Sequence, residues 1–247
     1  MNYAEYGNQN KEIMIFLHGG GLSWWNYREA AQMLSADYHV ILPILDGHAG
    51  SSDDFSAIEE NAKRILSFID EELGGSVLLI GGLSLGAQIL VEMLSQRQKI
   101  CQYALIESAS VIPSGWTCSL IRPAFGCCYG LIKRRWFARL QFRSLRMKQE
   151  LFEDYYRDTC GISKSNLISF LQANAMYSLK PSFQESDAKG FIFAGEKENP
   201  KMKKSAKMLQ KAWRGSTLRI LPKWHHGEFS INHAQDYVNC VRRIIQS

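Results

Sequence analysis

The stretch VLLIGGLSLGAQILVEML, at residues 77–94, contains the pattern that decides the fold. It begins with an unbroken apolar run, typical of a strand buried on both faces, and continues with the apolar spacing of a helix from residue 85 onward. Between the two parts, Gly82-Leu83-Ser84-Leu85-Gly86 places a serine with a glycine two residues to either side. Glycines let a strand and a helix approach closely around a tight turn, which leaves the serine hydroxyl free at the end of the strand. Ser84 is therefore the candidate nucleophile.

The chain on either side of this stretch alternates in the same way. Short apolar runs, partly β-branched, are separated by amphipathic stretches, which predicts an α/β fold with a mostly parallel central sheet and helices on both faces. We expect strands at 14–17, 39–44, 77–81, 103–106, 191–194 and 218–221. We expect helices at 26–34, 56–73, 85–96, 201–213 and 234–245. Because only residues 2–6 are available for earlier strands, we expect about six or seven strands.

The alternation is interrupted once, between residues 109 and 187. This segment has no clear strand but has amphipathic stretches near 131–147, 148–158 and 163–178. We interpret it as a helical cap inserted into a core formed by residues 1–108 and 188–247.

The composition is that of a globular protein. Of the 247 residues, 46% are hydrophobic and 21% are charged, which excludes bulk disorder, and no apolar run is long enough to predict a membrane span. The first residues lack the pattern of an export signal, and the six cysteines have no zinc-ligand spacing. We therefore expect a cytoplasmic protein with reduced thiols and no metal.

The net charge of +5 comes from the middle of the chain. Residues 110–188 contain 11 Lys/Arg and 6 Asp/Glu, whereas the remaining residues contain 18 of each. Two interpretations fit a basic cap: it attracts an acidic substrate or an anionic membrane surface, or its apolar side covers a pocket while its arginines are merely solvated. No nucleic-acid-binding module is recognisable, so we do not expect nucleic acid as a partner.

Consecutive glycines follow the first expected strand, in His18-Gly19-Gly20-Gly21. Bare backbone at such a place lets N–H groups approach a substrate oxygen, as an oxyanion hole requires. We expect the amides of Gly20 and Leu85 to be the donors, with Gly21 as the next choice. The alternative is a dinucleotide-binding loop, but residues 18–22 do not have the Gly-x-Gly-x-x-Gly spacing that such a loop requires.

With these motifs the chain resembles the α/β-hydrolase superfamily, in its small single-domain branch with a helical cap. Residues 46–51, DGHAGS, also look like the family's Gly-His loop after the next strand. The resemblance implies a nucleophile, then an acid, then a histidine in chain order. It points to His226 as the base, with the adjacent His225 as the alternative. It points to Glu198, a few residues beyond the expected strand 191–194, as the acid.

Glu107, at the end of strand 103–106, is the alternative acid, because some members of the family carry the acid there. Gly21, Trp24 and Trp25 follow the glycine-rich loop and are candidate pocket residues, although the tryptophans could equally be core.

Together these residues predict a serine hydrolase of the carboxylesterase type that cleaves a small ester or thioester through an acyl-enzyme, without a cofactor. A lyase, a synthase or a C–C bond hydrolase acting on an acidic substrate is the alternative within the same fold. A non-catalytic interaction module is a third possibility. The oligomeric state stays open.

Overall fold

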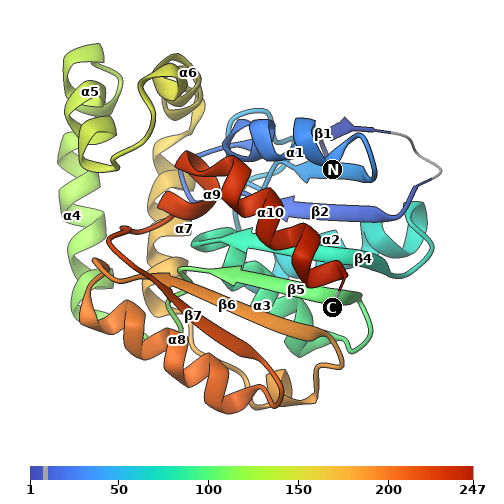
Figure 1. Ribbon diagram of the computed structural model, residues 1–247. Helices are drawn as coiled ribbons and strands as arrows, with labels where there is room; N and C mark the ends of the chain where they lie inside the picture. Colours follow the sequence, from blue (N-terminus) through green and yellow to red (C-terminus); the bar gives the residue numbers. More distant parts are fainter. Residues whose placement is uncertain (8–10, 247) are drawn as a thin grey trace.

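A seven-stranded sheet forms the centre of the molecule, in a computed structural model that describes residues 1–7 and 11–246 (Figure 1). The strand order is β1-β3-β2-β4-β5-β6-β7, and only β1 runs antiparallel to its neighbour. The strands are β1 (Tyr3–Tyr6), β2 (Ile13–Leu17), β3 (His39–Pro43), β4 (Val77–Leu83), β5 (Cys101–Glu107), β6 (Lys189–Gly195) and β7 (Thr217–Leu221). The six expected strands and the mostly parallel sheet are confirmed, and residues 3–6 supply the edge strand β1.

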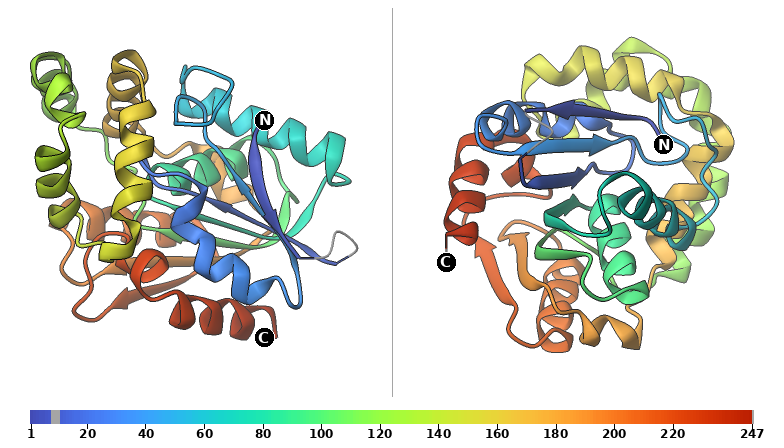
Figure 2. Two further views of the ribbon diagram at one scale, coloured as in Figure 1. Left: turned by 90° about the horizontal axis from the view of Figure 1, so that it is seen from above. Right: turned by 90° about the vertical axis from the view of Figure 1, so that its right-hand side faces the viewer.

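Helices cover both faces of this sheet, as Figures 1 and 2 show. One face packs against α1 (Arg28–Leu34), α9 (Glu228–Asn232) and α10 (Ala234–Ile245). The other packs against α2 (Ile58–Glu72), α3 (Leu85–Gln96) and α8 (Pro200–Ala212). The central strand β4 is buried along its whole length, because both of its faces are covered. Its C-terminal end is therefore a rigid support for Ser84 and α3, which follow it in the chain.

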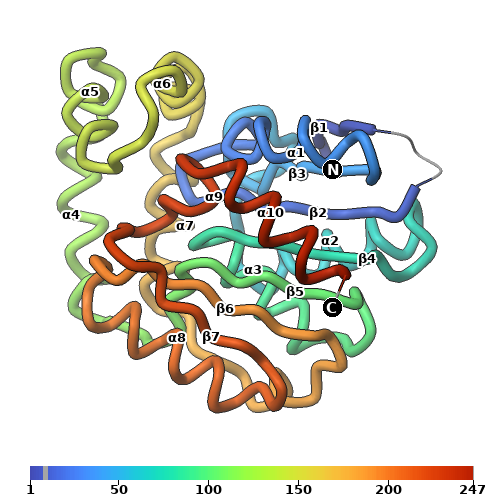
Figure 3. Tube along the Cα trace, viewed as in Figure 1, coloured from blue at the N-terminus to red at the C-terminus, as the bar shows by residue number. Residues whose placement is uncertain are grey.

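Between β5 and β6 the chain leaves the sheet and returns, a path that Figure 3 traces without the helical ribbons. The excursion consists of α4 (Gly115–Ile132), α5 (Arg135–Ser144), α6 (Phe152–Gly161), α7 (Lys164–Met176) and the 3-10 helices η2 (Gln149–Leu151) and η3 (Pro181–Glu185). Helix α4 packs on α7 and lies at the outer edge of the molecule. Among the described residues, no helix has the length and apolar character needed to cross a membrane.

The sequence analysis expected one amphipathic stretch at 131–147, and this expectation is wrong. The structure contains a helix boundary inside it, because Lys133 ends α4 and Arg134 adopts an extended backbone before α5. The larger part of α4, residues 115–130, was not expected to be helical. Pro123 and three glycines lie within α4, and these residues lower intrinsic helix propensity. Packing of α4 against α7 overrides that local preference.

Candidate functional site

Ser84 occupies the turn between β4 and α3 with a positive φ of 52° and ψ of −108°, a backbone conformation that residues with a side chain rarely adopt. Its amide donates a 2.9 Å hydrogen bond to the carbonyl of Glu107 on the neighbouring strand β5. The glycines beside it permit the close approach: a Cβ on Gly86 would lie 2.2 Å from the carbonyl oxygen of Leu17, and a Cβ on Gly82 would lie 2.6 Å from the carbonyl oxygen of Gly86. The turn is therefore strained but held by its neighbours, as a nucleophile elbow requires.

The three amides of the glycine loop differ in their partners. The Gly19 amide donates to Oδ1 of Asn26 at 3.3 Å, and the Gly21 amide donates to Nε2 of His48 at 3.0 Å. Within the described part of the chain, neither the Gly20 amide nor the Leu85 amide at the start of α3 has a hydrogen-bond partner. The Gly20 backbone lies against Leu85, since a Cβ on Gly20 would be 3.4 Å from the Leu85 side chain. Two donors are thus left beside Ser84 for an oxygen atom of a substrate.

Two buried histidines hold this loop in shape. His18 accepts the Leu45 amide on Nε2 at 3.1 Å, and its Nδ1 lies 2.9 Å from the Gly19 carbonyl. His48 accepts the Gly21 amide on Nε2, and its Nδ1 donates to the Asp46 carbonyl at 3.0 Å. Burial lowers the pKa of His48 to about 4 and places the pKa of His18 well below its ordinary value. Both rings are therefore neutral near pH 7, each accepting one backbone N–H.

His226 follows β7 and is hydrogen-bonded to Glu198, with 3.0 Å between Nδ1 and Oε2. The other oxygen of Glu198 accepts the Gly195 amide at 2.7 Å and the Ser108 hydroxyl at 2.8 Å. Burial by itself raises the pKa of Glu198, but these bonds and the proximity of His226 more than offset it, so the pKa lies below its ordinary value. Glu198 is thus a carboxylate at neutral pH. Ser108 was missed by sequence reasoning, because nothing in its local sequence marks it.

His225, the neighbouring histidine, has a different partner. Its Nδ1 lies 3.1 Å from Oε2 of Glu228, and the same oxygen accepts the His225 amide at 2.7 Å. Adjacent side chains thus pair with different carboxylates.

Glu107 is a second buried carboxyl near this site. Its Oε1 accepts the Ser230 amide at 3.4 Å, and its Oε2 has no hydrogen-bond partner among the described residues. Burial raises the pKa of Glu107 to about 7. Among the described residues, His226 is hydrogen-bonded to Glu198 and not to Glu107, which is 3% exposed.

Ser84 and His226 line one cavity of about 130 Å³. The other lining residues are glycines or apolar side chains: Gly19, Gly20, Leu22, Leu83, Leu145, Met147, Gly227 and Ile231. No Lys or Arg of the described chain is among them. The cavity is smaller than pockets that enclose drug-sized ligands, and it is mostly apolar. It suits a short, uncharged group next to the serine.

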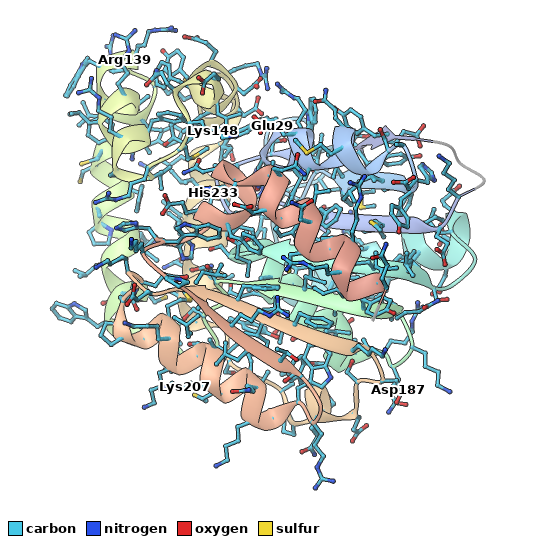
Figure 4. All side chains as sticks on the ribbon, in the orientation of Figure 1. Glu29, Arg139, Lys148, Asp187, Lys207 and His233 are labelled. Carbon is cyan, nitrogen blue, oxygen red and sulfur yellow. The ribbon has the colours of Figure 1, made fainter. Side chains whose placement is uncertain are left out.

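Part of the cavity wall comes from the segment after α5. Leu145 and Met147 flank Arg146, whose carbonyl accepts the Asn232 side-chain amide at 2.7 Å. The Lys148 amide donates to Oδ1 of Asn232 at 3.2 Å. Figure 4 labels Lys148 beside Glu29, and their side chains form an ion pair of 2.6 Å. These contacts fix the wall to α9 and α1 of the core.

Gly21, Trp24 and Trp25 are not among the lining residues of this cavity. Trp25 is 1% exposed and its indole donates to Oδ2 of Asp158 at 2.7 Å, so it joins η1 (Trp24–Tyr27) to α6. The Arg28 guanidinium lies over the Trp24 ring, 4.8 Å from its centroid. The described residues also contain no group of three or more His, Cys, Asp or Glu side chains arranged to hold a metal ion.

Comparisons with known proteins agree with this architecture. The chain is 32% identical over 119 residues to Lipase 1 of Psychrobacter immobilis, a match that covers 47% of this chain and only 37% of that protein. Its fold is similar to that of an esterase from Exiguobacterium antarcticum, with a TM-score of 0.83, 15% identity and coverage of 99% and 95% of the two chains. It is also similar to MenH from S. aureus, with a TM-score of 0.78, 16% identity and 99% coverage of both chains. The model of the alpha/beta hydrolase family matches residues 14–239, and the chain therefore belongs to that family.

Proposed function

We propose that the protein is a serine hydrolase that cleaves a small carboxylic ester or thioester by acyl transfer. The observation that carries this proposal is the hydrogen bond between His226 and Glu198 at a cavity that Ser84 also lines. A serine hydroxyl needs a nearby base to become nucleophilic, and a histidine oriented by a carboxylate is such a base.

In this mechanism the Ser84 oxygen attacks the carbonyl carbon while His226 accepts the hydroxyl proton on Nε2. Glu198 accepts the Nδ1 proton in a hydrogen bond and stabilises the imidazolium. The negative oxygen of the tetrahedral intermediate accepts hydrogen bonds from the amides of Gly20 and Leu85. His226 then gives the proton to the leaving group, which departs and leaves an acyl group on Ser84. In the second half of the reaction His226 takes a proton from water, the water oxygen attacks the acyl carbon, and the carboxylic acid is released as the proton returns to Ser84.

The segment between β5 and β6 acts as a cap in this proposal. Residues 109–187 form the cap, and residues 1–108 with 188–247 form the core. Leu145 and Met147 line the cavity beside Ser84 and give it an apolar wall against which the acyl group would pack. A cavity of about 130 Å³ favours a short acyl chain.

A lyase or C–C bond hydrolase with an acidic substrate is the second candidate. The excess of basic residues between positions 110 and 188, 11 Lys/Arg against 6 Asp/Glu, favours it. The lining of the cavity weighs against it, because the Lys and Arg side chains of the described residues lie elsewhere and the wall is apolar. A polycarboxylate buried there without a cationic partner would be costly.

The decisive experiment labels Ser84 with a fluorophosphonate and measures hydrolysis of p-nitrophenyl esters of increasing acyl length. We expect labelling and turnover of the shortest esters, and loss of both in Ser84→Ala. Equal ester turnover by the two proteins would reject the mechanism. Labelling without ester turnover, together with turnover of an anionic eliminable substrate, would favour the second candidate.

A further inference from the structure

The outer surface of α4 carries an exposed apolar stripe. Trp116 is 77% exposed and Leu120 is 46% exposed, values unusual for side chains of this size. Cys127 and Leu131 are exposed as well, about two and three helical turns beyond Leu120. The spacing 116, 120, 127 and 131 places these residues on one side of the helix, and an 18-residue helix is about 27 Å long. Ile121 and Ile132 are its buried residues, on the opposite side.

Helix α5 continues this exposed apolar surface. Trp136 and Leu140, four residues apart, are 60% and 55% exposed. We call the exposed residues Trp116, Leu120, Cys127, Leu131, Trp136 and Leu140 the outer apolar surface. Figures 1 and 2 show α4 and α5 at the edge of the molecule, away from the sheet.

Basic residues alternate in the sequence with those of the outer apolar surface, and acidic ones are absent from the same stretch. No Asp or Glu occurs between Glu107 and Glu150, whereas eight Lys or Arg do. Arg135 pairs with Glu153 and Lys148 with Glu29. The other six have no ion pair with the described carboxylates: Arg122, Lys133, Arg134, Arg139, Arg143 and Arg146.

We propose that α4 and α5 dock onto an anionic lipid bilayer through the outer apolar surface and its six unpaired basic residues. Exposed tryptophans and leucines enter the boundary between headgroups and acyl chains, and arginines beside them contact lipid phosphates. The combination of the two kinds of residue on neighbouring helices is what a charged membrane interface requires.

A second copy of the chain fits this surface less well. In a symmetric dimer the same patch meets itself, so the unpaired basic residues of one copy would face those of the other without an acidic partner. A nucleic acid would satisfy the charges but leave aliphatic residues such as Leu120 and Leu140 without a partner. An anionic bilayer satisfies both.

Flotation of the protein with vesicles tests the proposal. We expect binding to vesicles that contain 30 mol% phosphatidylglycerol, at least about tenfold weaker binding to pure phosphatidylcholine vesicles, and weakening by added salt. The charge-reversal variant Arg134→Glu/Arg143→Glu and the variant Trp116→Ser/Trp136→Ser should each bind at least about tenfold more weakly.

The matched control for charge is Lys204→Glu/Lys207→Glu on α8. Both lysines are exposed, and Figure 4 labels Lys207 at the opposite end of the molecule from Arg139. This variant has the same change in net charge and should bind anionic vesicles as the wild type does. Thermal unfolding midpoints within a few degrees of wild type establish that the variants are folded, independently of any enzyme activity.

Several results would overturn the proposal. One is that the wild type does not bind vesicles at low salt. Another is that the α8 variant and the arginine variant weaken vesicle binding equally. Binding that the tryptophan variant leaves unchanged would also overturn it. Self-association abolished by the tryptophan variant, without vesicle binding, would identify a second copy as the partner. Retention on single-stranded RNA in place of vesicles would identify a nucleic acid.

Discussion

The Nδ1 atom of His226 lies 3.0 Å from Oε2 of Glu198, although the two residues are 28 positions apart. The bond joins the loop after β7 to the loop after β6. Because Nδ1 donates to a carboxylate, the proton is fixed on that nitrogen and Nε2 is left as a base.

Replacement of Glu198 by glutamine should reduce kcat about 10²- to 10⁴-fold, because the amide no longer stabilises the imidazolium. Steady-state hydrolysis of a short p-nitrophenyl ester measures this. The matched control is Glu107→Gln, which removes the other buried carboxyl and should change kcat only a few-fold at pH 8. A larger loss in Glu107→Gln than in Glu198→Gln would transfer the role of the acid to Glu107.

His226→Ala should lower kcat by at least about 10³-fold, since the general base is lost. His225→Ala should retain most of the activity, because His225 pairs with Glu228. The two variants differ by one position in the same loop, so loop damage would affect both. Similar losses in the two would contradict the assignment of the base.

Shortening Leu145 to alanine should shift the preferred ester toward longer acyl chains, because Leu145 forms part of the cavity wall. We expect kcat/KM for hexanoate relative to acetate esters to rise about tenfold, the scale of one or two methylenes in an apolar pocket. Leu140→Ala, a leucine of α5 that does not line the cavity, is the control and should leave the ratio unchanged.

Gly86→Ala should destabilise the fold by more than about 2 kcal/mol, because its Cβ would meet the backbone carbonyls of Leu17 and His18 at 2.2 and 2.6 Å. Gly126→Ala in α4 has open space around the added Cβ and should stabilise by up to about 1 kcal/mol. Urea unfolding followed by circular dichroism measures both. An unchanged free energy of unfolding in Gly86→Ala would mean that the turn at Ser84 can accommodate the added Cβ.

Glu107 should make the stability of the protein depend on pH. Its pKa is raised from 4.5 to about 7, so the folded state holds the proton more tightly than the unfolded chain does. This contribution is complete below about pH 4.5 and is lost as the pH rises to about 7, a change of about 3 kcal/mol.

Glu107→Gln removes that titration. The free energy of unfolding of the variant, relative to wild type, should therefore increase between pH 5 and pH 8. Other titrating groups, such as Asp46 and His48, are present in both proteins and cancel in the difference. A difference that stays constant with pH would show that Glu107 is ionised in the folded protein throughout this range.

Local sequence patterns were sufficient for the elements of the core. The apolar run before Ser84 and the glycines around it predict a strand, a turn and a helix, and the structure has β4 and α3 in those places. Such elements could be predicted because buried strands and amphipathic helices have periodicities of their own. Helix α4 could not, because Pro123 and its glycines oppose a helix locally and tertiary contacts, above all with α7, stabilise it.

The sequence by itself determined the sheet, its covering helices and a short list of residues able to react. The tertiary structure alone decided which of those residues meet. It paired His226 with Glu198 and His225 with Glu228, and it placed Leu145 and Met147 at the cavity. It also bonded the Gly21 amide to His48, while the Gly20 amide has no partner among the described residues. The physical reason is that a hydrogen bond or a cavity wall depends on distances between segments far apart in the chain, which local propensity and periodicity do not encode.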